Sequence, residues 1–206
     1  MPHKFDPREK HLLLSDEREA ALQPEKLLRK LGLRAGDTMA DIGCGPGFFT
    51  LPAARIVGRN GIVLAGDIQG EMLTSVRGRA HEAELGNVRV VKTSETEIPL
   101  PAESFDFVLL AFVLNELEHR ATFLHRAARL LKPTGRVVVL EWERAETPSG
   151  PPLEDRVSRD ELVEDALAAG LKVKDDGELG DGQYYYVFGR TTRERVRDAE
   201  QEAVAR

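Results

Sequence analysis

The chain is poor in cysteine and in long apolar runs. Its 206 residues include one cysteine, Cys44, which excludes a disulfide within the chain and fits a reducing compartment. No apolar run approaches the roughly 20 residues that a membrane-spanning helix needs, and no segment has the pattern of a secretory signal peptide. We therefore expect a cytoplasmic protein with no membrane span.

Metal ligands and basic clusters are also scarce. The five histidines include no pair at helical ligand spacing and Cys44 has no thiol partner, so we expect no metal site. The net charge is −6, and no Lys/Arg cluster with interleaved aromatic residues occurs before the C-terminal residues. Nucleic acid is therefore not an expected partner. The partner that we expect is a small-molecule substrate. The length fits one domain with a full core.

Apolar strand patterns and helical patterns alternate from Thr38 onward. The strand patterns cover residues 38–42, 62–65, 88–91, 105–111 and 136–140, and helical patterns lie between them at about 48–57, 71–85 and 121–131. This alternation predicts an α/β fold of the Rossmann-like, doubly wound kind, a mostly parallel sheet with helices on both faces.

The C-terminal part predicts one more helix and a hairpin. Ser158 and Glu161 form the pattern of a capping box, which starts a helix that runs to residue 169. Residues 171–173 and 183–188 follow as strand patterns, separated by a predicted loop that contains Gly177, Gly180 and Gly182. Such a hairpin adds two strands and makes the last strand of a seven-stranded sheet antiparallel.

The segments at the two ends of the chain belong to no strand–helix unit. Residues 1–30 predict a helical arm, with helix starts at Ser15 and Pro24, and residues 191–206 predict a charged helix or tail. The main domain is expected to cover residues 31–190. The sequence leaves open whether the arm covers a binding site or only an edge of the domain, and whether the protein is a monomer or a homodimer.

A glycine turn between the first strand and the first helix is the strongest site signal. Gly43, Gly45 and Gly47 occur at alternate positions after Asp41, and glycine lets the backbone approach a ligand closely while the following helix presents free N–H groups. The dinucleotide fingerprint G-x-G-x-x-G requires a small residue where this chain has Phe48. The run reads D-x-G-x-G-x-G instead; a turn that binds no ligand is the plain alternative.

This run resembles the first motif of the class I S-adenosylmethionine-dependent methyltransferases, and the chain is most similar to their small ubiquinone/menaquinone-type members. The resemblance implies S-adenosylmethionine as the cofactor and a seven-stranded methyltransferase domain over residues 31–190. It also implies transfer of a methyl group to a small-molecule acceptor by in-line displacement, which depends mainly on positioning.

The resemblance also implies which residues contact the cofactor. Asp67, at the end of the second strand, can accept hydrogen bonds from the ribose hydroxyls; capping of the next helix is the alternative function of this side chain. Ser94 and Glu95 stand where the family holds the adenine, Ser94 in place of the usual acid. The full implied set is Asp41, Gly43, Cys44, Gly45, Gly47, Asp67, Ile68, Ser94, Glu95, Ala111 and Phe112.

Residues after the fourth strand are the candidate catalytic group. The resemblance implies that Asn115 or Glu116 faces the acceptor, and Glu116 and His119 are candidate bases, although residues of these types also start helices or lie on surfaces. A base is needed only if the acceptor loses a proton.

Two other functions are compatible with the same glycine turn and acidic residue. An NAD(P)-dependent oxidoreductase would share the turn and Asp67, but Phe48 argues against it and no Tyr-x-x-x-Lys pair is present. A non-catalytic protein that binds S-adenosylmethionine is the other alternative.

Overall fold

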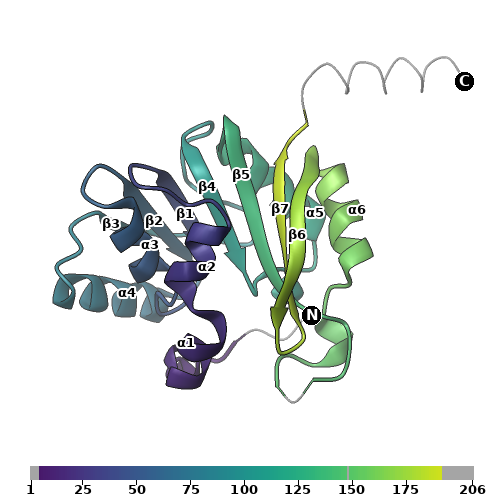
Figure 1. The fold of residues 1–206 in the computed structure, drawn as a ribbon, viewed down its shortest axis with the longest axis horizontal. Coiled ribbons are helices and arrows are strands. Elements are labelled where there is room, and N and C mark those ends of the chain that lie inside the picture. The colour runs from purple at the N-terminus through teal and green to yellow at the C-terminus, as the bar shows by residue number, and fades with distance from the viewer. Residues whose placement is uncertain (1–4, 148, 192–206) are drawn as a thin grey trace, which may run out of the picture.

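A seven-stranded sheet runs through the part of the chain that the computed structural model describes, residues 5–147 and 149–191 (Figure 1). The strands are β1 (Thr38–Ile42), β2 (Ile62–Asp67), β3 (Val88–Lys92), β4 (Phe105–Ala111), β5 (Leu131–Trp142), β6 (Leu171–Gly180) and β7 (Gln183–Arg190). Their order across the sheet is β3-β2-β1-β4-β5-β7-β6.

The pairing of these strands is mostly parallel. β1 lies between β2 and β4 and is parallel to both, while β7 is antiparallel to both β5 and β6. The predicted fold class, with an antiparallel last strand, is confirmed. β1 is also the point at which the strand order changes direction, and α/β sheets of this kind bind ligands beside the carboxyl ends of the strands at such a point.

Six α-helices and four short 3₁₀ turns accompany the described sheet. The helices are α1 (Asp16–Leu22), α2 (Pro24–Lys30), α3 (Thr50–Val57), α4 (Gly70–Glu82), α5 (Arg120–Leu130) and α6 (Arg159–Ala168). The turns are η1 (Pro7–Glu9), η2 (Leu12–Leu14), η3 (Leu114–Glu116) and η4 (Leu153–Asp155). In the described ranges no helix is both long and apolar enough to cross a membrane.

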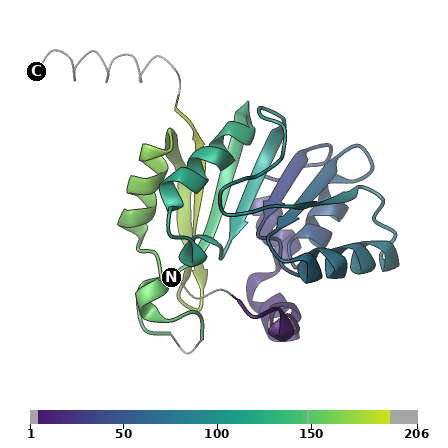
Figure 2. The same ribbon diagram turned by 180° about the vertical axis from the view of Figure 1, so that it is seen from behind.

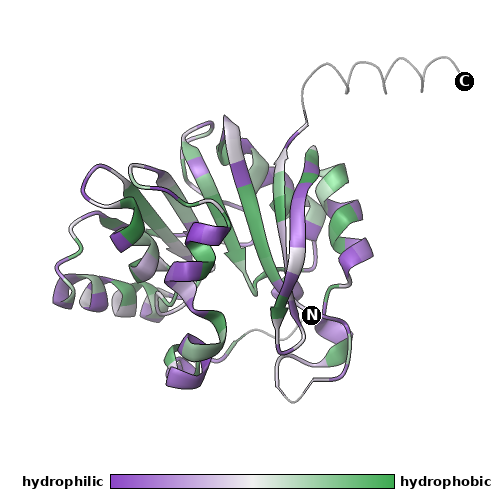
Figure 3. Cartoon of the chain, in the orientation of Figure 1, coloured by the Kyte–Doolittle hydropathy of each residue, from purple (hydrophilic) through white to green (hydrophobic). Residues whose placement is uncertain are grey.

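Helices cover both faces of the sheet because neighbouring strand residues point in opposite directions. Met39 packs in one buried cluster with Leu28 of α2, and Ala40 packs in another with Leu124 of α5. α4 lies on the face of α2 and α3, whereas α5 and α6 cover the other face (Figures 1 and 2). The strands inside the sheet are accordingly hydrophobic, and the helices expose hydrophilic sides (Figure 3).

Local sequence signals set several helix starts. The Ser158 hydroxyl accepts a hydrogen bond from the Glu161 N–H, and the Glu161 carboxylate accepts one from the Ser158 N–H, which completes the predicted capping box of α6. Ser15 caps α1 in the same way through the Arg18 N–H, and Pro24 occupies the first position of α2.

The predicted glycine loop between the last two strands was wrong. β6 continues through Gly177 to Gly180, and only Asp181 and Gly182 connect it to β7. Gly177 pairs with Tyr185, and a Cβ atom at Gly177 would lie 2.8 Å from the ring of that tyrosine. Glycine at this position therefore makes room for a cross-strand aromatic ring. The predicted C-terminal helix falls almost wholly on residues 192–206, outside the described residues.

Candidate active site

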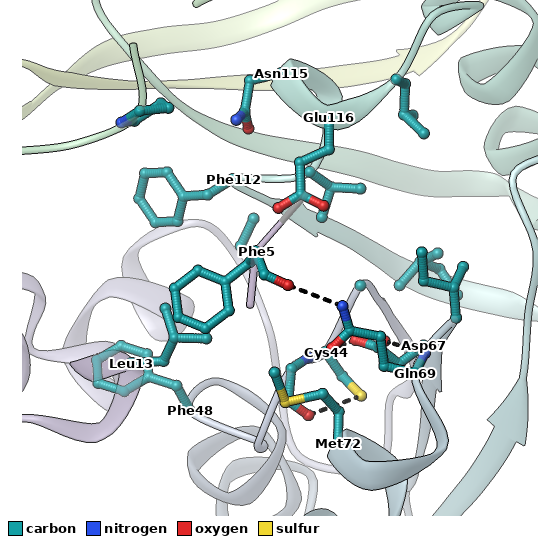
Figure 4. A pocket seen from close by; sticks show the side chains of 18 of the residues that line it. Phe5, Leu13, Cys44, Phe48, Asp67, Gln69, Met72, Phe112, Asn115 and Glu116 are labelled. Carbon is teal, nitrogen blue, oxygen red and sulfur yellow. Dashed lines mark hydrogen bonds between the residues drawn. The ribbon is translucent and has the colours of Figure 1, made fainter. Parts of the chain in front are cut away.

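A cavity of about 940 Å³ opens beside the carboxyl ends of the central strands (Figure 4). Its wall is built from the glycine turn after β1, the end of β2 and the segments that follow β3, β4 and β5, and the N-terminal arm contributes Phe5, Leu12, Leu13 and Arg18. This volume is in the range of sites that hold drug-sized ligands or cofactors. The cavity therefore lies at the position that the sheet topology favours.

The glycine turn needs glycine at all three positions because of its backbone conformation. The φ angles of Gly43, Gly45 and Gly47 are +74°, +52° and +91°, in the left-handed region that L side chains rarely adopt. A Cβ atom at Gly43 would lie 2.4 Å from Val113 Cγ2, so that side of the turn is fully packed. A Cβ atom at Gly45 would meet only Leu13 Cδ1, at 3.5 Å, because Gly45 faces the cavity.

Asp67 joins the glycine turn to the start of α4. Its Oδ2 accepts a hydrogen bond from the Gly45 N–H at 2.9 Å, and its Oδ1 accepts one from the Gln69 N–H at 2.7 Å. Gln69, rather than Asp67, occupies the N-cap position of α4. Burial raises the pKa of Asp67, while the two backbone donors act in the opposite direction. Each carboxylate oxygen keeps a lone pair with which it can accept from a ligand.

Asp41 and Cys44 form the floor of the cavity. Asp41 is 2% exposed and accepts a hydrogen bond from the Thr50 hydroxyl at 2.5 Å. Burial, with a smaller effect of the Asp67 charge, raises the pKa of Asp41 to about 7. Burial and the same neighbouring carboxylates raise the pKa of the Cys44 thiol, which therefore stays protonated at neutral pH and is not a nucleophile.

Ile68, Ser94 and Glu95 line the cavity beside Asp67, as does Met72 of α4. The backbone N–H of Ser94 donates to the Glu97 carbonyl, and the Ser94 hydroxyl lies 3.2 Å from that of Thr96, so a turn fixes this segment. Residues 68, 94 and 95, which the sequence singled out, are thus brought together.

Phe112 directly follows Ala111, the last residue of β4, and forms the cavity wall opposite Asp67. Its backbone is strained. Its φ angle is +60°, which is uncommon for a bulky residue and costs on the order of 1–3 kcal/mol. The Phe112 N–H donates to the Leu140 carbonyl at 2.8 Å, which holds the residue in place, and its ring centroid lies 5.9 Å from that of Trp142. The surrounding structure thus fixes an aromatic wall at this end of the cavity.

Two of the three candidate catalytic residues line the cavity. Asn115 and Glu116 lie in η3, and Glu116 points its carboxylate toward the cavity (Figure 4). The Asn115 side-chain oxygen is buried and has no hydrogen-bond partner among the described residues. His119 is exposed at the N-cap of α5 and is not among the lining residues.

A buried carboxylate, Glu141, holds η3 in position. Glu141 is fully buried at the end of β5, and its Oε1 accepts a hydrogen bond from the Leu114 N–H at 2.8 Å. Burial raises the pKa of Glu141 to about 7, against the effect of several backbone donors. Because Leu114 is the first residue of η3, this bond orients the turn that carries Asn115 and Glu116.

The loop after β5 forms the remaining wall and is held by Arg156. This guanidinium donates to the carbonyls of Glu143, Ala145, Ser149 and Pro151 at 2.6–3.2 Å. It also lies 5.5 Å from the Trp142 ring centroid.

The sequence left open whether the N-terminal arm covers a binding site, and the structure shows that residues of the arm form part of the cavity wall. The Gln69 side-chain amide donates to the Phe5 carbonyl at 2.9 Å, and the guanidinium carbon of Arg18 lies 4.6 Å from the Phe48 ring centroid. No local pattern in the arm shows these contacts, since they arise only when the arm folds back onto the glycine turn.

The charges around the cavity are unequal. Its described lining holds six carboxylates but only one cation, Arg18; the carboxylates are Asp41, Asp67, Glu95, Glu116, Glu154 and Asp155. Within residues 5–147 and 149–191, no group of three or more His, Cys, Asp or Glu side chains is placed to hold a metal ion.

Comparisons with known sequences agree on one family. A model described as a methyltransferase domain matches residues 40–139. The ubiquinone/menaquinone biosynthesis C-methyltransferase UbiE of Marinomonas sp. is 36% identical over 117 residues, which is 56% of this chain and 47% of that protein. UbiE of Azotobacter vinelandii is 38% identical over 114 residues, 55% of this chain and 45% of that protein. The chain thus spans about half the length of the curated relatives it matches.

Solved structures extend the likeness to nearly the whole chain. A SAM-dependent methyltransferase from Aquifex aeolicus is 33% identical with a TM-score of 0.87, over 91% of this chain and 100% of that one. The [4+2]-cyclase SpnF, at 18% identity and a TM-score of 0.71 over 92% of this chain and 86% of that one, shares the fold alone.

Proposed function

Because the chain belongs to the S-adenosylmethionine-dependent methyltransferases, we propose that it transfers a methyl group from S-adenosylmethionine to a small-molecule acceptor in the cavity of about 940 Å³. The observation that carries this proposal is the contact between Asp67 and the Gly45 N–H, which fixes an acid beside a glycine turn. Such an arrangement fits an adenosine cofactor, and membership of the methyltransferase family makes S-adenosylmethionine that cofactor.

The residues around the cavity suit the parts of this cofactor. Asp67 has lone pairs left for the ribose hydroxyls, and Gly45 leaves the space that a side chain would fill. In the proposal, Ile68, Ser94 and Glu95 hold the adenine. Asp41, Gly43 and Gly45 face the amino-acid end, and Ala111 and Phe112 lie beside the sulfonium; Gly47 is not among the lining residues.

The chemistry asks little of the protein beyond positioning. Bound S-adenosylmethionine supplies a methyl group on an activated sulfonium; the acceptor bonds to that carbon while the carbon–sulfur bond breaks and its electron pair stays on sulfur. The aromatic wall of Phe112 and Trp142 excludes water and aligns the acceptor, which accounts for most of the expected rate enhancement.

Proton transfer is assigned to η3. Glu116 is the candidate base for an acceptor that must lose a proton, since its carboxylate faces the cavity and His119 does not line it. In the proposal, Asn115 lies on the acceptor side of the cavity; its side-chain oxygen is buried and has no partner among the described residues. An acceptor with an apolar body and a hydroxyl or amino group fits both features.

Calorimetric titration with S-adenosylhomocysteine, with NADH in parallel, tests the cofactor class. We expect micromolar binding of the first and none of the second. Asp67→Ala should weaken binding about 10- to 100-fold, because it removes charge-assisted hydrogen bonds. Glu71→Ala, which removes an exposed carboxylate from the first turn of α4 outside the cavity, is the matched control. Equal affinity of wild type and Asp67→Ala would contradict the site.

Transfer of a labelled methyl group separates an enzyme from a binding protein. Incubation with methyl-labelled S-adenosylmethionine and a panel of phenols, quinols and amines should give labelled product with at least one class. Glu116→Gln should reduce transfer and leave the affinity for S-adenosylhomocysteine unchanged. Tight cofactor binding without transfer to any acceptor would favour the non-catalytic alternative, and binding of NADH would favour the oxidoreductase.

A further inference from the structure

Arg18 is a charged residue that lines the cavity, and the proposed function assigns no role to it. It belongs to α1 of the N-terminal arm. Among the described lining residues it is the one cation, and six carboxylates line the same cavity. Burial lowers the pKa of Arg18 to about 10, which is still well above neutral pH. The guanidinium is therefore charged when a ligand enters.

The protein provides few partners for this charge. The Arg18 Nη1 donates to the Leu13 carbonyl at 3.1 Å, and the guanidinium lies over the rings of Phe48 and Phe112, 4.6 and 5.4 Å from their centroids. In the described part of the chain no carboxylate forms an ion pair with it, and the shift of its pKa has burial as its cause. A guanidinium has five N–H donors, so most of its capacity is left for a ligand.

This arrangement favours binding of an anion. Partial burial of a cation costs free energy that the two aromatic rings offset only in part. Both rings lie against the guanidinium, and the planar fork of a guanidinium matches the two oxygens of a carboxylate. Arg18 is therefore prepared for a carboxylate ligand rather than for an ion pair within the protein.

The position of Arg18 indicates which carboxylate it meets. Phe48 directly follows the glycine turn, and Leu13, whose carbonyl accepts from Arg18, has its Cδ1 3.5 Å from the Cβ position at Gly45. The guanidinium thus lies close to the glycine turn. We propose that Arg18 binds the carboxylate of the amino-acid end of S-adenosylmethionine and so links the N-terminal arm to cofactor binding. This inference rests on the proposed function.

A two-ligand comparison tests the assignment. Wild type and Arg18→Met are titrated with S-adenosylhomocysteine and with its decarboxylated analogue, which has the same adenosine, thioether and amine but no carboxylate. The readout is the ratio of the two affinities in each protein. We expect this ratio to be about 10- to 100-fold larger in the wild type, the size of a charge-assisted, bidentate contact. Loosening of the arm affects both ligands and cancels in the ratio.

Two further variants serve as controls. Arg18→Lys keeps the charge without the fork and should retain part of the preference for the carboxylate, whereas Arg29→Met removes an exposed arginine of the same arm and should retain all of it. An unchanged ratio in Arg18→Met overturns the inference, whether both affinities fall together or neither changes. If the wild type binds neither ligand, the proposed function itself fails; if it binds both with an unchanged ratio in the variant, only the role of Arg18 fails.

Discussion

Replacement of Gly43 by alanine tests whether the positive φ angle and the close packing against Val113 require glycine at this position. The φ angle of +74° costs a residue with a side chain about 1–2 kcal/mol. The new Cβ atom would also lie 2.4 Å from Val113 Cγ2, and Val113 is β-branched and has little freedom to rotate away. Overpacking of this kind costs about 1–3 kcal/mol. We therefore expect a loss of about 2–5 kcal/mol in the free energy of unfolding.

Two other glycines separate the strain from the clash. Gly36 has a φ angle of +85°, is exposed and has nothing within 4 Å of its Cβ position, so Gly36→Ala should show the strain alone, about 1–2 kcal/mol. Gly78 lies exposed inside α4 with the same open space and an ordinary φ angle. Gly78→Ala should stabilise the protein by about 0.4–1 kcal/mol.

Urea unfolding of the three variants, with thermal unfolding beside it, measures these differences. For a chain of this length, 1 kcal/mol corresponds to about 2–4 °C in melting temperature, so Gly43→Ala should melt roughly 4–20 °C below the wild type. A loss of stability in Gly43→Ala no greater than that in Gly36→Ala would refute a steric clash between residue 43 and Val113. A loss in Gly78→Ala equal to that in Gly36→Ala would refute the cost assigned to the positive φ angle.

Two further predictions concern buried charged side chains near the cavity. The pKa of Glu141 is about 7 in the fold, against 4.5 ordinarily, so the native state keeps a proton that the unfolded chain releases between those values. The stability of the wild type should therefore fall as the pH rises through this window, whereas that of Glu141→Gln should not. The melting temperature of Glu141→Gln minus that of the wild type should accordingly be larger at pH 8 than at pH 4. An equal difference at the two pH values would contradict the raised pKa. Arg156→Met removes four hydrogen bonds to loop carbonyls, so amide hydrogen exchange should become faster over residues 143–151 but not in β1, and exchange as slow as in the wild type would contradict that role.

The fold was predictable because its signals are local. Apolar runs gave the positions of β1 and β4 to the residue, since strands buried on both faces contain few polar interruptions. The length of β6 was not predictable, because Gly177 reads as a loop residue until the Tyr185 ring that requires it is in place.

The site was predictable where its residues lie at or just after the ends of β1, β2, β3 and β4. Asp67 and Gly45 follow from the strand–turn–helix pattern, and the structure joins them by a hydrogen bond. Arg18 carries no such signal, because its place depends on how the arm folds over the turn. Glu116 lines the cavity and His119 does not, and the spacing of these two residues along the chain does not reveal that difference.

The unequal charge of the cavity has a consequence for turnover. S-adenosylmethionine carries one net positive charge, whereas the thioether left after methyl transfer is neutral overall. The six carboxyl groups that line the cavity outweigh the one arginine even though Asp41, with a pKa of about 7, is only partly ionised at neutral pH, so they attract the reactant more strongly than the spent product. In the proposed reaction, the same electrostatic field that draws the methyl donor in therefore favours release of S-adenosylhomocysteine and limits product inhibition.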